Sequence, residues 1–205
     1  MGIAERKESE KKKMRSRILH AAMKLFLEKG FENVTIRRIA ERIEYSPATI
    51  YLYFKNKDDI LYALYREGFE ELYRRQQAIL TIKDPLKRLR KHGEVYLSFA
   101  LDNPEYYDLM FIMRGPIKKI KENEEWEMAL RSYEFLKENI KDCVDTSVIR
   151  KAKMDVITFS LWSCIHGVAS LIIRDRCIMF SEEQLLVIVE AVFDFILNSI
   201  SQRKK

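Results

Sequence analysis

Small side chains stand beside hydrogen-bond donors near residue 50 of the chain. A helix carrying Pro47, Ala48 and Thr49 can come close to the edge of a base pair. The Thr49 hydroxyl can hydrogen-bond a base, and the carbons of Pro47 and Ala48 can contact a thymine methyl group. Phenol and ammonium donors, which suit phosphate oxygens, follow at once. The segment's predicted DNA contacts are Ser46, Pro47, Ala48, Thr49, Tyr51, Tyr53, Lys55 and Lys57.

Two arginines lie ten residues upstream, Arg37 and Arg38. On a helix they occupy the face opposite Ile36, Ile39 and Ala40. They are therefore candidates for contact with phosphate or with a guanine edge. Ion pairing within their own helix is the alternative interpretation.

Start and stop signals predict how these residues are positioned. Thr35 is a predicted N-cap for a short helix that ends near Ile43, and Ser46 with Pro47 predicts the start of the next helix. Only a few residues around Glu44 separate the two. Two short helices joined by a tight turn predict a helix-turn-helix, whose second helix enters the major groove. A flanking helix ends at a predicted left-handed Gly30, and another begins at Asn56.

The distribution of charge along the chain supports placing DNA binding in its N-terminal part. Residues 1–57 hold 14 Lys and Arg against 7 Asp and Glu, whereas residues 58–205 hold 23 against 24. A basic module joined to a neutral body is typical of a polyanion-binding protein with a second function. The run Lys11–Lys13 is expected to be a disordered, solvated tail, and contact with DNA is its alternative.

The chain as a whole reads as all-α, with about nine helices. Six glycines and four prolines in 205 residues are too few for an all-β protein or a glycine-rich phosphate loop. Three cysteines without CxxC spacing predict a reducing, cytoplasmic location. The uncharged stretch between Asp155 and Arg174 is interpreted as a buried or interface helix and not as a membrane span. No cofactor or metal is predicted.

Residues 18–61 resemble the N-terminal module of the tetracycline-repressor (TetR/AcrR) family of transcription factors. The resemblance implies that Thr35, Tyr51 and Lys57 hold phosphates and that residues 47–49 face bases. Glu44 departs from the family's usual glycine, so it either adopts a left-handed conformation or uses another turn. The matching positions are Ile18-Leu19, Ala21-Ala22, Leu25-Phe26, Gly30-Phe31, Thr35-Ile36, Ile39-Ala40, Ser46, Thr49-Ile50-Tyr51, Phe54, Lys57 and Ile60-Leu61.

The remaining chain is expected to form a ligand-binding body. The predicted domains are 12–72 for DNA binding, and 73–205 for ligand binding and dimerisation. Residues 103–107 and the Trp162–Gly167 region resemble one C-terminal subclass of the family, which implies a pocket near Trp162 and His166. Ordinary core packing is the alternative for each pocket residue. The candidates are Phe99, Tyr106, Met110, Phe111, Met113, Trp126, Tyr133, Phe159, Trp162 and His166.

The last two apolar helices, near 147–173 and 181–200, are the predicted dimer faces. Their predicted interface residues are Val168, Leu171, Ile172, Leu185, Ile188, Val189, Val192, Phe195 and Ile196. The leading hypothesis is a homodimeric, ligand-responsive repressor that binds a palindromic operator and is released by an apolar small molecule. One alternative is a DNA-binding regulator without an effector. The other is an all-α enzyme of lipid or amine chemistry, for which no catalytic motif is visible.

Overall fold

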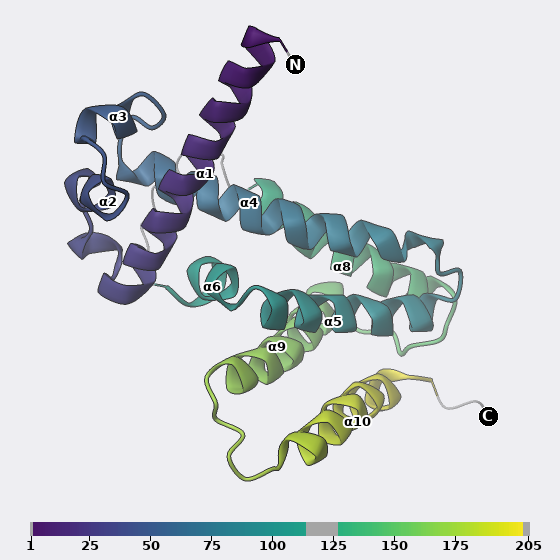
Figure 1. Cartoon of the computed structure of the whole chain (residues 1–205). Helices are drawn as coiled ribbons and strands as arrows, with labels where there is room; N and C mark the ends of the chain where they lie inside the picture. The colour runs from purple at the N-terminus through teal and green to yellow at the C-terminus, as the bar shows by residue number, and fades with distance from the viewer. Residues whose placement is uncertain (1, 114–126, 203–205) are drawn as a thin grey trace. The chain divides into compact units, whose positions relative to one another are not determined.

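The computed structural model describes residues 2–113 and 127–202. Within them the protein is helical, with nine α-helices (Figure 1). The described residues divide into two compact units. Unit 1 comprises residues 2–69 and 105–113, and unit 2 comprises residues 70–104 and 127–202. The expectation of an all-α fold is confirmed, and the predicted division at residue 72 stays a prediction.

Unit 1 contains the predicted DNA-binding segment. Its elements are α1 (Ile3–Lys29), η1 (Phe31–Asn33), α2 (Ile36–Arg42), α3 (Pro47–Tyr51), the first part of α4 (Lys57–Gln77), α6 (Pro104–Tyr107) and the π-helical turn η3 (Asp108–Ile112). One apolar face of α1 packs against the short helices: Ile18, Ala22 and Phe26 are fully buried, as are Ile39 of α2 and Ile50 of α3. This core fixes α3 from behind.

Unit 2 is built from the end of α4, η2 (Ala78–Thr81), α5 (Pro85–Asp102), α8 (Glu127–Asp145), α9 (Met154–Ile173) and α10 (Glu182–Ile200). Helix α5 packs against both α8 and α9. The core between them contains Leu89, Ile140, Cys143, Ile149 and Ile157. Asp84 caps α5 by accepting a hydrogen bond from the Lys87 amide.

Helix α10 packs Leu197 and Ile200 against this core and has one buried residue, Phe193. A Cβ atom at Gly93 of α5 would lie only 2.7 Å from the Phe193 ring, so α5 and α10 approach closely here because residue 93 is glycine. Arg90 of α5 pairs with Glu190 and Asp194 of α10 and lies 5.7 Å from the centre of the Phe193 ring. Most of α10 is otherwise exposed in the single subunit.

Three sequence predictions need correction. The basic run Lys11–Lys13 lies inside α1 and is not a disordered tail. Gly30 ends α1 as expected, but with φ 78° and ψ 148° it is outside the left-handed helical region. The helix expected near residue 147 begins at Met154, because Ser147 has a positive φ of 57° and Ile149 forms an antiparallel bridge with Ser201.

Candidate nucleic-acid interface

Both helices of the predicted helix-turn-helix begin at the residues expected from the sequence. The Thr35 hydroxyl accepts a hydrogen bond from the Arg38 amide at 3.3 Å and caps α2. The Ser46 hydroxyl does the same for the Thr49 amide at 3.3 Å, and Pro47 occupies the first turn of α3. Each cap satisfies an amide that the helix itself leaves unpaired. The position of α3 is therefore encoded locally.

The turn between α2 and α3 uses a left-handed residue. Glu44 has a φ of 60°, so it adopts the left-handed conformation. This is one of the two alternatives expected for a residue that stands where the family usually has glycine. The amide of Tyr45 then returns to the Ala40 carbonyl at 3.0 Å. Arg17 of α1 also holds this turn, since its guanidinium donates to the Ile43 carbonyl at 3.0 Å and lies 5.3 Å from the centre of the Tyr45 ring. Sequence reasoning missed this role of Arg17.

Helix α3 presents a solvent-facing side. Pro47 and Ala48 are exposed and Thr49 is half-buried, whereas Ile50 is fully buried. Tyr51 is 57% exposed, and Leu52 beside it is 78% exposed, although the sequence argument did not single it out. A buried anchor with small, exposed neighbours is what a helix needs to enter the major groove.

The two arginines of α2 are exposed but engaged in the free protein. Arg37 pairs with Glu41 at 3.0 Å, and both side chains are largely exposed, so this pair contributes little stability. Arg38 donates to the Asn33 carbonyl. The ion-pair alternative is thus present for Arg37 in the free protein.

Lys57 lies at the start of α4 and reaches back towards η1. Its ammonium donates to the carbonyl oxygens of Phe31 at 3.0 Å and Glu32 at 3.4 Å. Lys55 is exposed and Tyr53 is half-buried. An ammonium group has three donors, so Lys57 can hold this loop and still face a phosphate.

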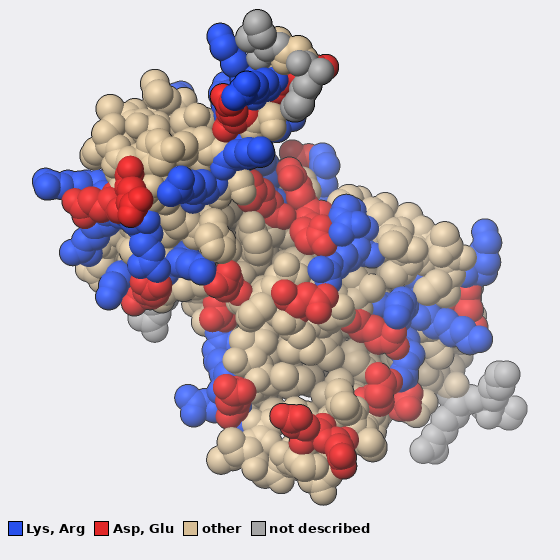
Figure 2. Space-filling view, viewed as in Figure 1, with Lys and Arg blue, Asp and Glu red and all other residues tan. Residues whose placement is uncertain are grey.

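Basic side chains cover much of unit 1. Figure 2 shows Lys and Arg side chains along α1 and around α2, with acidic side chains among them. This mixture of basic and acidic side chains agrees with the sequence of positions 1–57, which holds 14 Lys and Arg and 7 Asp and Glu. The net excess of positive charge in positions 1–57 is what can attract phosphate.

The structure assigns the predicted pocket residues to both units. Tyr106, Met110, Phe111 and Met113 belong to unit 1, and Phe99, Tyr133, Phe159, Trp162 and His166 belong to unit 2. Trp126 lies outside the described residues. In unit 1 the Tyr106 hydroxyl donates to Glu67 at 3.1 Å, and burial, with the charge of Glu67 second, raises the pKa of Tyr106 to about 12.

The pocket candidates of unit 2 form an aromatic group. The Trp162 ring lies 6.4 Å from that of Tyr133, 6.0 Å from that of Phe159 and 5.6 Å from that of His166, measured between ring centres. His166 shares a hydrogen bond of 2.9 Å with the hydroxyl of buried Tyr96. Burial lowers the pKa of His166, and the nearby charge of Arg174 lowers it further.

The predicted dimer residues lie on α9 and α10. Leu171 is 51% exposed and Phe195 is 77% exposed in the single subunit. The remaining seven are half-buried: Val168, Ile172, Leu185, Ile188, Val189, Val192 and Ile196. Further apolar side chains, Leu186 and Val187, are exposed on α10.

Helix α9 is the one described helix whose length and composition would suit a membrane span. Its most apolar 18-residue stretch has a mean hydropathy of 1.9, and 22% of that stretch is buried. The core helix of a soluble protein passes the same test. Among the residues that the structure describes, no group of three or more His, Cys, Asp and Glu side chains could hold a metal ion.

These features define a helix-turn-helix regulator, and comparisons with known proteins identify the family. Residues 18–64 match the model described as bacterial regulatory proteins, tetR family. Residues 89–196 match the model for the tetracyclin repressor-like C-terminal domain. The second match alone covers more than half of the chain. The protein therefore belongs to the tetR family of transcriptional regulators, a family of DNA-binding proteins and not of enzymes.

Several relatives have a stated role. The HTH-type transcriptional regulator HbdR of Aromatoleum sp. (strain CIB) is 26% identical over 188 residues, which cover 86% of this chain and 79% of HbdR. The fatty acid metabolism regulator protein of Bacillus subtilis (strain 168) is 37% identical over 60 residues. That match spans only 29% of this chain and 31% of the relative.

Solved structures have the same fold. The TetR family regulator PfmR of Thermus thermophilus superposes with a TM-score of 0.71 at 23% identity and covers 93% of this chain and 98% of its own. The fatty acid degradation regulator FadR of Bacillus halodurans gives a TM-score of 0.71 at 17% identity and covers 89% and 94%. At these identities the likeness establishes the fold alone.

Proposed function

We propose that this regulator is a cytoplasmic repressor that binds a palindromic operator as a homodimer and is released by a largely apolar small molecule. The exposed side of α3, backed by the fully buried Ile50, is the observation that carries the DNA-binding part of the proposal. Thr49 and its small neighbours face bases in this account. Thr35, Tyr51 and Lys57 hold phosphates, with Arg37 and Arg38 beside them.

Two copies are needed because one helix-turn-helix reads one half-site. A two-fold axis places two α3 helices in successive major grooves, about 34 Å apart. The exposed apolar side chains of α9 and α10 support an interface on these helices, because a stable monomer rarely exposes so much apolar surface in one place. Two helices from each subunit would form a four-helix bundle.

The effector class follows from the aromatic and methionine side chains predicted to line the pocket. Methionines such as Met110 and Met113 adapt to ligands of varied shape. The names of two relatives, which regulate fatty acid metabolism or degradation, favour a fatty acid or an acyl derivative. Such a ligand releases DNA only if it binds more tightly to the subunit arrangement that mismatches the grooves.

Substitutions in α3 test the DNA-binding part. Thr49→Ala should change which sequences are selected from a random duplex pool, because a base contact is lost. Tyr51→Phe should weaken binding to all duplexes alike, because a phosphate contact is lost. Equal sequence preference in wild type and Thr49→Ala would reject base reading by Thr49.

A thermal-shift screen of lipophilic compounds, read beside DNA release, tests the effector part. A compound at 100 times its dissociation constant should stabilise the protein by about 2.7 kcal/mol and release DNA. Trp162→Ala should weaken its binding. If only small, highly charged metabolites have both effects, the apolar effector class is wrong.

A further inference from the structure

Exposed apolar surface in unit 1 is concentrated at α3. Among the residues of unit 1 that the structure describes, four large hydrophobic side chains are exposed: Tyr45, Tyr51, Leu52 and Ile112. Three of the four lie within residues 45–52, which contain α3. Leu52 is the most exposed of the four, at 78%. An aliphatic side chain that stands in water beside α3 is therefore a candidate contact for whatever α3 binds.

The backbone places Leu52 on the same side of α3 as Ala48. Leu52 follows Ala48 by four residues, which is about one helical turn. Its φ of −70° and ψ of −17° continue the helical path one residue past Tyr51. Ala48 and Leu52 are both exposed, whereas Ile50 on the other side is fully buried. Ala48 and Leu52 thus form an apolar strip on the outer side of α3.

Polar groups beside this strip are few. Pro47 has neither a side-chain donor nor a backbone N–H. The Ser46 hydroxyl accepts from the Thr49 amide at 3.3 Å and lies 3.1 Å from the Thr49 hydroxyl. Part of the hydrogen-bonding capacity of both hydroxyls is therefore used within the helix cap. The outer side of α3 consequently offers a base pair more apolar surface than hydrogen-bonding groups.

The chemistry of the major groove limits what this strip can contact. Thymine presents an apolar group there, its C5-methyl group, beside its O4 acceptor. The edges of the other bases are read through donors and acceptors, which an aliphatic side chain would leave without a partner. As the second helix of the helix-turn-helix, α3 is the helix that enters this groove. The group that fits the strip is therefore a thymine methyl group.

We propose that Ala48 and Leu52 contact thymine methyl groups of the operator, and that Leu52 determines sequence specificity. The inference rests on the DNA-binding part of the proposed function and deepens it by naming the bases. Residues four apart on a helix are separated by about 6 Å along its axis, and successive base pairs by about 3.4 Å. Each half-site should therefore contain two thymines about two base pairs apart, on either strand.

Leu52 differs in kind from the phosphate-binding residues near it. Donors such as those of Tyr51 and Lys55 can bind the DNA backbone whatever the sequence. A leucine side chain has no charge and no hydrogen-bonding group, so it gains nothing from a phosphate. The contribution of Leu52 to affinity must therefore depend on the bases beneath it.

Uracil in place of thymine tests this inference. The full-length wild-type protein first selects a duplex from a random pool. Each thymine of a half-site is then replaced by uracil, in both half-sites together. The exchange removes one methyl group from each half-site and leaves pairing with adenine unchanged. Because burial of one methyl group changes affinity by about fourfold, replacement at the Leu52 contact should weaken binding by about fourfold for each half-site.

Substitution of Leu52 assigns the effect to this residue. In Leu52→Ala, thymine and uracil should bind alike at one position that wild type discriminates. Leu80→Ala, which shortens a leucine of η2 that is 52% exposed, is the matched control and should keep the wild-type response. Since Leu52 is exposed, Leu52→Ala should fold as wild type does, which circular dichroism checks. If no thymine responds to uracil, or if Leu52→Ala responds at every position as wild type does, the inference is overturned.

The outcomes separate this inference from the proposed function. A selected duplex that is bound equally well with thymine and with uracil would retain DNA binding and reject the reading of methyl groups. An equal loss of affinity for all duplexes in Leu52→Ala would place the side chain against sugar carbons and would also reject it. Failure to select any duplex would reject both proposals.

Discussion

The Lys57 ammonium donates to the Phe31 carbonyl at 3.0 Å and lies 4.3 Å from the centre of the same residue's ring. One side chain thereby ties the start of α4 to η1, which precedes α2. A lysine expected from its family position to hold DNA is therefore also part of what holds the module together.

Lys57→Met should lower the free energy of unfolding by about 1–2 kcal/mol, because a charged hydrogen bond and a cation–π contact are lost. Chemical denaturation measures this effect. Lys55→Met, at an exposed position close by, is the control and should stay within about 0.5 kcal/mol of wild type. Equal stability of all three proteins would contradict a structural role for Lys57.

Glu44→Gly should stabilise the protein by up to about 1 kcal/mol, because glycine adopts the observed φ of 60° without the steric cost of a side chain. Glu41→Gly, inside α2, should instead destabilise it by about 0.5–1 kcal/mol. Thermal unfolding of both variants provides the comparison. A lower melting temperature for Glu44→Gly would mean that the Glu44 side chain makes a stabilising contact.

His92 should make stability depend on pH. Burial lowers its pKa to about 4 in the folded protein from an ordinary value of 6.5, so the unfolded chain binds the proton first. The contribution is complete above pH 6.5 and is lost as the pH falls towards 4, by about 3 kcal/mol in all. Denaturation of wild type and His92→Gln at pH 7 and pH 5 should show the difference between them shrinking at pH 5. A constant difference would mean that His92 is charged or solvated.

Phe195→Asp should separate the subunits while each keeps its fold, because Phe195 is 77% exposed in the single chain and is predicted to be buried between copies. An unpaired charge there costs several kcal/mol of association. Sedimentation velocity reports the assembly and circular dichroism the fold. Asn198→Asp, at an exposed site on the same helix, should remain dimeric. A dimeric Phe195→Asp would move the interface away from this face of α10.

Local signals in the sequence were enough to predict the helix-turn-helix. The helix starts depend on contacts made only a few residues along the chain, by Thr35, Ser46 and Pro47. Their capping roles can therefore be predicted from spacing. The left-handed Glu44 was one of two alternatives, since a non-glycine residue in a tight turn leaves few conformations. The start of α9 was predicted wrongly, because the bridge between Ile149 and Ser201 joins positions far apart in the chain.

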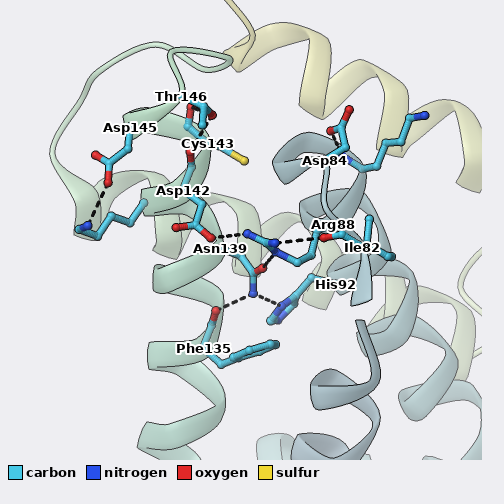
Figure 3. Close-up of polar contacts among 12 residues, drawn as sticks. Ile82, Asp84, Arg88, His92, Phe135, Asn139, Asp142, Cys143, Asp145 and Thr146 are labelled. Carbon is cyan, nitrogen blue, oxygen red and sulfur yellow. Dashed lines mark hydrogen bonds and ion pairs between the residues drawn. The ribbon is translucent and has the colours of Figure 1, made fainter. Parts of the chain in front are cut away.

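Contacts between distant residues account for what the sequence did not predict. Arg17 and Ile43 meet only because α1 packs behind the turn. Gln76, His92 and Asn139 lie on three different helices, and no spacing rule connects them (Figure 3 shows His92 and Asn139). The contact between Lys57 and the Phe31 carbonyl was likewise not predicted, because the two residues are 26 positions apart in the chain.

The salt dependence of DNA binding tests the central claim most directly. Fluorescence anisotropy should be recorded with the full-length protein and a duplex selected by it from a random pool. If six to ten phosphates are contacted by the basic unit 1, affinity should fall by roughly 10³–10⁵ between 50 and 200 mM salt. Affinity that does not change with salt, or the failure of any duplex to be selected, would contradict the account.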